Sequence, residues 1–195
     1  QYGFQILFLV CYLFILFIMQ KDNIRHHIHL HFLVFIAGFT AILGKLITNS
    51  PFSIVWHRMF IALIVIFLFV AITRKKLKTS YQNIFKYAIL GFVISLHWIT
   101  FFMSIDYSNV TIALSMMSTT AFFTSFIEPF FFSRKIIAHE LLLSILVIIA
   151  IFLILNSELN YSAGIILGIF SAFFASIFSV LNGLLIKNEK AYKIS

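Results

Sequence analysis

Residues 52–78 read FSIVWHRMFIALIVIFLFVAITRKKLK, an apolar run interrupted by one formal charge, Arg58, and closed by a basic cluster. A hydrocarbon layer roughly 30 Å thick requires about 20 apolar residues at 1.5 Å of helix rise per residue. Because a backbone in lipid must satisfy its own hydrogen bonds, a run of this length predicts a membrane-spanning α-helix.

Similar runs recur along the chain and are joined by short polar connections. The predicted spans are Phe4–Met19, Phe32–Ile47, Phe52–Ile72, Ile84–Ile105, Val110–Phe132, Ile136–Leu155 and Ala163–Ile186. No connection is long enough to form a separate soluble domain. The predicted fold class is therefore an all-α polytopic membrane protein, a helical bundle whose surroundings are the lipid bilayer.

The overall composition supports this class and excludes others. Hydrophobic residues make up 62% of the chain and charged residues 10%, whereas soluble domains average nearer half and a quarter. The net charge of +8 does not indicate a nucleic-acid partner, because the basic residues lie in short clusters between apolar runs. Cys11 is the only cysteine, so neither a disulfide framework nor a cysteine-based metal site is expected.

Basic residues alternate along the connections, and this alternation predicts the topology. Twelve of the fourteen lie on one predicted side: Lys21, Arg25, Arg74, Lys75, Lys76, Lys78, Lys86, Arg134, Lys135, Lys187, Lys190 and Lys193. The alternate connections, around Ser50, Asp106 and Glu158, contain no lysine or arginine. Because cytoplasmic loops carry the excess of lysine and arginine, the prediction is a multi-pass protein of the bacterial cytoplasmic (inner) membrane with the basic loops in the cytoplasm.

The N-terminal stretch requires separate treatment. The sequence begins with Gln1, and Met19 is followed by an ordinary polar cytoplasmic start. We expect residues 1–18 to be a non-native apolar stretch; a genuine additional span is the alternative. An N-terminal peptide that begins before Met19 would reject the first interpretation.

From Phe32 onward, several short segments resemble a known family. They are Gly38 to Ile47, Ser53 to Arg58 followed by Ala62, His97 to Phe102, Ser108-Asn109-Val110, and Glu128-Pro129. In order and spacing they resemble the EamA-type permeases of the drug/metabolite transporter superfamily. The resemblance covers about Phe32 to Lys190.

The resemblance implies ten spans in two five-span repeats of opposite topology. Residues 19–156 then correspond to the first repeat, and residues 157–195 to the incomplete start of the second, where Gly164, Gly168 and Asn182 match its opening span. The chain is thus expected to be truncated and to need a missing second half or a second copy. Such transporters hold their solute near the midplane between the repeats.

Two basic residues, Lys45 and Arg58, lie outside the basic connections and flank the turn at Thr48–Pro51. Charges within a bilayer usually face a cavity or a partner, and the only acid in a nearby connection is Asp106. One interpretation is an electropositive vestibule that binds a carboxylate-bearing solute. The alternative is that both side chains snorkel to the outer surface.

Other polar residues within the spans are weaker candidates for solute contact. In the predicted span Val110–Phe132, small hydroxyl residues recur at helical spacing: Thr111, Ser115, Ser118 and Ser125, with Thr119, Thr120 and Thr124 alongside. Helix packing is the favoured interpretation, with a solute-lining face formed by Ser115, Ser118 and Thr119 as the alternative. His97 and Trp98 either pack within the bundle or contact the solute.

Glu128 is a candidate for proton coupling, because desolvation favours the protonated form of a buried carboxylate. An interfacial ion pair with Arg134 or Lys135 is the favoured alternative. Pro129 removes a backbone donor beside it and can kink the helix.

The remaining polar motifs indicate neither a metal site nor an enzyme. The cluster His26, His27, His29 and His31 suits interfacial anchoring better than metal binding. No phosphate-binding glycine loop, Ser/His/Asp set or HExxH pattern occurs in the sequence. We therefore expect no cofactor, no metal and no enzymatic activity.

The predicted function is transport of a small metabolite, an amino acid or an organic acid, outward from the cytoplasm by alternating access. Direction and proton coupling are implications of the resemblance. Two alternatives stay open: a non-transporting truncated or assembly subunit, and a membrane-embedded enzyme.

Overall fold

A computed structural model describes residues 24–74, 80–155 and 159–186, and every regular element in these ranges is helical. The chain divides into two units, residues 1–40 and residues 41–195. The described part of the first unit is the beginning of helix α2 (Ile24–Leu46). The predicted span Phe4–Met19, the side chains of His26, His27 and His29, and the C-terminal lysines lie outside the described part.

The second unit contains the remaining helices. They are α3 (Pro51–Thr73), α4 (Tyr81–Tyr107), α5 (Val110–Met117), α6 (Thr120–Phe132), α7 (Ala138–Leu155), the short 3₁₀ helix η1 (Leu159–Tyr161) and α8 (Ser162–Ile186). Within the described residues, four spans are long and apolar enough to cross a membrane: Pro51–Thr73, Tyr81–Tyr107, Val110–Phe132 and Ser162–Ile186. The all-α polytopic membrane fold is therefore confirmed. Helix α2 begins eight residues before the predicted start at Phe32, and α3, α4, α7 and α8 begin and end within three residues of the predicted bounds.

Side chains in the polar connections cap the helices that follow them. The Ser50 and Ser80 hydroxyls accept hydrogen bonds from the backbone N–H groups of Ser53 (3.4 Å) and Asn83 (3.3 Å). Asn109 accepts in the same way from the N–H of Ile112 at 2.9 Å. These caps satisfy donors that the first turn of a helix leaves free, so the connections fix where α3, α4 and α5 begin.

The predicted span Val110–Phe132 is confirmed, and it consists of two helices that meet at Ser118 and Thr119. There the N–H groups of Ser118 and Thr119 bond carbonyls only three residues back, at 3.2 and 3.0 Å. The Thr119 and Thr120 hydroxyls also donate to the carbonyls of Met116 and Met117, both at 2.6 Å. Hydroxyl side chains compete for helical carbonyls in this way, which accounts for the break within the span.

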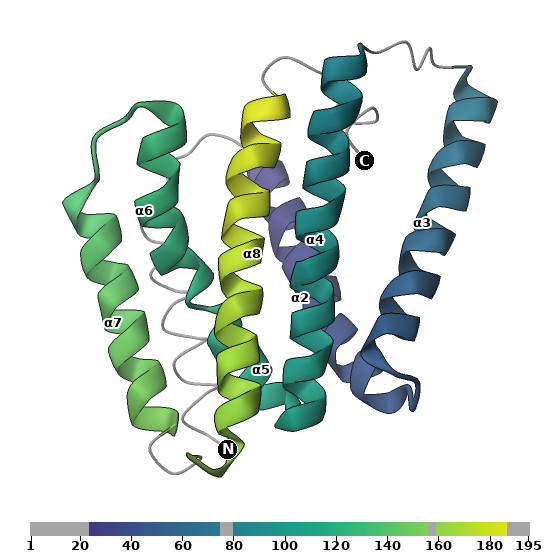
Figure 1. The fold of residues 1–195 in the computed structure, drawn as a ribbon. Helices are drawn as coiled ribbons and strands as arrows, with labels where there is room; N and C mark the ends of the chain where they lie inside the picture. The colour runs from purple at the N-terminus through teal and green to yellow at the C-terminus, as the bar shows by residue number, and fades with distance from the viewer. Residues whose placement is uncertain (1–23, 75–79, 156–158, 187–195) are drawn as a thin grey trace. The chain divides into compact units, whose positions relative to one another are not determined.

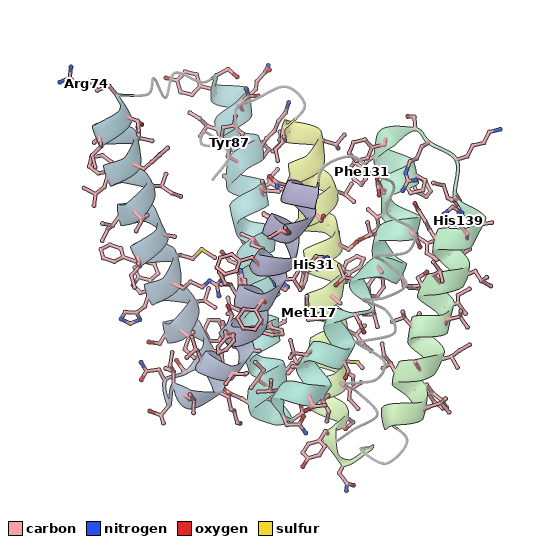
Figure 2. The ribbon with its side chains drawn as sticks, turned by 180° about the vertical axis from the view of Figure 1, so that it is seen from behind. His31, Arg74, Tyr87, Met117, Phe131 and His139 are labelled. Atoms are coloured by element: carbon pink, nitrogen blue, oxygen red, sulfur yellow. The ribbon has the colours of Figure 1, made fainter. Side chains whose placement is uncertain are left out.

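In the second unit, α8 lies between α4 and α6 (Figure 1), with α3 on the far side of α4 and α7 on the far side of α6. Consecutive spans run in opposite directions, so the connection after Arg74 and the connection containing Arg134 lie at the same end. Figure 2 shows Arg74 and His139 toward this end. We call it the basic end; Ser50 and Asp106 mark the opposite end.

Helix α8 packs against α4 through small residues on one face. The buried members of this face are Gly164, Gly168, Ser171, Ala172, Ser176 and Val180. A Cβ on Gly168 would come within 2.6 Å of the Met116 Cβ, so only glycine fits there. The Ser104 hydroxyl donates to the Gly164 carbonyl at 2.7 Å, which small residues at helix contacts permit. Helix α8 belongs to the same unit as α4, and the repeat boundary after residue 156 stays a prediction.

Candidate functional site

The candidate site is centred on Trp98, near the middle of α4. The Arg58 guanidinium carbon lies 3.6 Å from the centroid of the Trp98 ring. Arg58 is about 10 Å from the beginning of α3 and Trp98 about 13 Å from the end of α4, at 1.5 Å per residue, so the two meet at similar depth. A cation over an indole face is stabilised by about 0.5–2 kcal/mol, more when water is excluded.

This contact bears on the two interpretations of Arg58. A snorkelling arginine extends toward the nearest aqueous surface, whereas Arg58 lies across the face of Trp98 on the neighbouring helix. The contact favours a role within the spans for Arg58, and solute binding there stays a prediction. Lys45, by contrast, is exposed at the last turn of α2, where snorkelling remains compatible with its position.

Trp98 belongs to an aromatic cluster in which one ring stacks on it and another meets it edge-on. Trp98 stacks on Phe102 with ring centroids 5.8 Å apart and meets Phe101 edge-on at the same distance. Gly44 of α2 faces the Phe102 ring so closely that a Cβ at this position would overlap the ring, which favours glycine there. Buried Ala41, Val55 and Ile105 complete this core. The indole is therefore held in a fixed position from α2, α3 and α4.

His97 lies next to Trp98 and is joined to α8. The imidazole is 6% exposed and its centroid is 4.9 Å from that of Trp98. Its Nδ1 lies 3.0 Å from the Ser171 carbonyl oxygen and 2.9 Å from the Ser171 hydroxyl. That hydroxyl also reaches the His97 carbonyl at 3.1 Å. His97 therefore contacts both Ser171 of α8 and the neighbouring Trp98 ring of α4.

The break between α5 and α6 reaches the same region through Met117, which Figure 2 shows where the two helices meet. The Ser171 hydroxyl lies 3.5 Å from the Met117 sulfur. Ser115 is buried and its hydroxyl has no hydrogen-bond partner within the described structure. Thr119 is buried and bonded to the Met116 carbonyl, whereas Ser118 is exposed. The three hydroxyl residues predicted as a group therefore differ in their surroundings.

Glu128 lies elsewhere, on the turns of α6 nearest the basic end. It makes the ion pair with Arg134, at 2.9 Å, that the sequence analysis favoured. The same guanidinium reaches Glu140 of α7 at 3.2 Å. Burial alone would lower the pKa of Arg134, but the hydrogen bonds to Glu128 and Glu140 outweigh it and raise that pKa above its ordinary value. Through Arg134, Glu128 of α6 is thus joined to Glu140 of α7. A role of Glu128 in proton coupling stays a prediction.

The other features of the described residues do not add to the site. In those residues, no group of three or more His, Cys, Asp or Glu side chains could hold a metal ion. A shallow apolar hollow on α6 is lined by Phe126, Ile127, Phe130 and Phe131. It contains no group that could bind a polar solute.

Residues 27–156 match the EamA-like transporter family, which is two thirds of the chain. The chain belongs to the EamA-like transporter family. No curated protein and no solved structure matches it. In this EamA-like chain, three of the predicted solute-binding residues, Arg58, Trp98 and His97, lie close together on α3 and α4, and their binding of a solute stays a prediction.

The contact of Ser171 with His97 was not predicted from the sequence. Ser171 lies on α8, beyond the matched residues 27–156. A signal was available: Gly164, Gly168, Ala172 and Ser176 recur every fourth residue, and this spacing is typical of a close helix contact. Ser171 lies beside that row, but the sequence alone does not show that its partner is His97.

Proposed function

We propose that this EamA-like chain moves a small carboxylate-bearing metabolite, an amino acid or an organic acid, across the bacterial inner membrane and outward from the cytoplasm. Membership of a transporter family supports the general activity. The observation that carries the finer proposal is the Arg58 guanidinium held against Trp98 within the spans. A positive charge at that depth usually serves a partner or a solute pathway.

The charges around Arg58 favour a carboxylate as the group it receives. Among the described residues, the ion pairs are those of Arg134 with Glu128 and Glu140. The indole covers one face of the guanidinium but accepts no hydrogen bond from its in-plane N–H groups. These N–H groups can therefore donate to a planar oxyanion such as a carboxylate. Trp98 and its aromatic neighbours would then hold the apolar part of the solute.

Transport in full requires a second half, supplied by a longer polypeptide or by a second copy of this chain. We infer rocking of one repeat against the other, with the basic end in the cytoplasm. Cysteine labelling tests the orientation in a Cys11→Ser background. Arg74→Cys and Lys135→Cys should be protected from an impermeant maleimide in intact cells, and Asp106→Cys should react. Equal reaction at all three positions would overturn the proposed orientation.

The solute class is tested in proteoliposomes with radiolabelled organic acids, each measured beside its neutral amide. Arg58→Gln should reduce protein-dependent uptake of the acids by about tenfold or more, because a charge-assisted hydrogen bond is lost. Uptake of the amides should change much less.

Lys45→Gln is the matched control, since it removes a cation from the neighbouring exposed position on α2. It should leave the ratio of acid to amide uptake close to the wild-type ratio. Equal losses of acid and amide uptake in Arg58→Gln would show that Arg58 has a structural role only, and would reject the proposed carboxylate site.

A further inference from the structure

The contact between His97 and Ser171 determines which imidazole nitrogen carries the hydrogen. Nδ1 of His97 lies 3.0 Å from the backbone carbonyl oxygen of Ser171. A carbonyl oxygen can only accept a hydrogen bond, so at this distance Nδ1 must be the donor. The Ser171 hydroxyl, 2.9 Å from Nδ1, can accept from the same N–H while it donates to the His97 carbonyl at 3.1 Å. Every group in this small network then has a compatible role.

We propose that α8 is a working part of the solute site: Ser171 positions His97 as the Nδ1–H tautomer, so that the neutral ring offers Nε2 to the solute as a hydrogen-bond acceptor. Ser171 is thus a positioning residue that acts through His97. The proposal rests on the proposed function for the identity of the solute, but the tautomer itself does not depend on it.

The tautomer has a consequence for specificity. Arg58 and His97 lie against the same indole, with the guanidinium carbon at 3.6 Å and the imidazole centroid at 4.9 Å from its rings. One small acid can therefore place its carboxylate on Arg58 and a neighbouring group near His97. Because Nε2 of the neutral ring only accepts, that group must be a donor. The site should select acids with a hydroxyl or amino group at carbon 2 over the unsubstituted acids.

Ser171 lies in a part of the chain that the family match does not cover. Helix α8 follows the matched residues 27–156, and Ser171 is fully buried on its α4-facing side. The buried hydroxyl of Ser176, five residues further along α8, has no hydrogen-bond partner in the described structure. Ser176 therefore provides a matched control in which the same hydroxyl is removed from the same helix face.

The tautomer is measured first, without any solute. The full chain, labelled with ¹⁵N-histidine and reconstituted in nanodiscs, is compared with His97→Asn to identify the His97 signals. Nδ1 should resonate in the pyrrole-like range and Nε2 in the pyridine-like range at a pH where the ring is neutral. The opposite assignment would overturn the proposal.

The role of Ser171 is measured in the same spectra. Ser171→Ala should shift both nitrogens toward averaged values, because the backbone carbonyl alone holds the ring less firmly. Ser176→Ala should leave both signals unchanged. If Ser171→Ala has no more effect than Ser176→Ala, the hydroxyl has no positioning role and that part of the proposal is wrong.

Specificity is tested with L-lactate and propionate, which differ by the hydroxyl at carbon 2. The wild-type chain should bind L-lactate about tenfold more tightly, the usual value of one well-placed hydrogen bond. His97→Asn retains a donor for the Ser171 carbonyl but lacks Nε2, so it should keep its unfolding temperature and lose the preference. An unchanged preference in His97→Asn would overturn the role of Nε2. If neither acid binds although the Nδ1–H tautomer is observed, the proposed function fails while the positioning of His97 stands.

Discussion

Helices α3 and α8 both pack against α4, but the two contacts differ in kind. On α8, small residues bring the backbones close, and hydrogen bonds join Ser104 to Gly164 and His97 to Ser171. On α3, contact is made mainly near the end that carries Ser50, by Arg58 and the buried Val55. Toward the basic end α3 diverges from α4 (Figure 1), and its apolar side chains there are mostly exposed.

The difference indicates which helix can move relative to α4. Displacing α8 would separate two helices whose backbones pack closely, and it would leave buried hydrogen-bonding groups without partners. The loss of those hydrogen bonds costs free energy where no water is available to replace them. Among the described residues, the second half of α3 buries Val70 but packs less extensively against α4 than α8 does, so displacing it should cost less. We therefore expect α4 and α8 to behave as a fixed pair and α3 to be the adjustable neighbour, with Arg58 and Trp98 at the contact between them.

The strongest test of this comparison is to separate α8 from α4. Gly164→Leu should destabilise the chain by about 3 kcal/mol, the upper range for overpacking a well-packed contact, because the new side chain meets Ser108 and the Ser104 carbonyl at the end of α4. Denaturant titration in micelles, followed by tryptophan fluorescence, measures the change. Gly91→Ala is the control, since a Cβ on Gly91 meets nothing within 4 Å. Equal stability of the two variants would show that the α4–α8 contact is not the tight one.

A smaller effect is expected at the contact between α3 and α4. Trp98→Leu removes the indole beneath Arg58 and should cost about 1–2 kcal/mol, the range for a cation on an aromatic ring out of water. Trp98→Phe keeps a ring and should recover part of the loss. Both are measured by chemical unfolding followed by circular dichroism, because Trp98 itself is a fluorophore. If Trp98→Phe is no more stable than Trp98→Leu, the contact with Arg58 contributes nothing measurable.

The smallest expected effect distinguishes the two halves of α3. Val55 is 5% exposed and belongs to the core around Phe101, whereas Val65 is 58% exposed. Val55→Ala should therefore destabilise the chain by about 1 kcal/mol through lost packing, and Val65→Ala should be close to neutral. The same unfolding titration compares them. A larger loss from Val65→Ala would mean that the second half of α3 is covered, contrary to the comparison.

Much of the fold could be predicted because it depends on local composition. Apolar runs long enough to span a membrane predicted the helices, whereas the caps formed by Ser50, Ser80 and Asn109 were found only in the structure. The break at Ser118 and Thr119 was not predicted, because hydroxyl residues are also common in uninterrupted spans. It is seen only in the structure, where the Thr119 and Thr120 hydroxyls bond backbone carbonyls between α5 and α6. For the same reason, Ser115, Ser118 and Thr119 could be named as polar positions but not separated into buried and exposed.

The candidate site shows the same division. Arg58 was identifiable because a charge is rare in a span, and Trp98 and His97 because they lie in a segment that resembles the family. Their mutual contacts depend on how α3 and α4 face each other, which no local pattern encodes. Ser171 was not identified at all, since a serine in an apolar helix has several ordinary explanations.

The amino-acid sequence is enough to predict a multi-span helical membrane protein, because the cost of burying backbone and charge in hydrocarbon depends on residue type and run length alone. The folded arrangement was needed to show that Arg58 rests on Trp98, that His97 bonds to Ser171, and that α8 belongs to the same packed unit as α4. These are contacts between residues distant along the chain, and their geometry follows from how close two helices can approach, which here depends on Gly164 and Gly168.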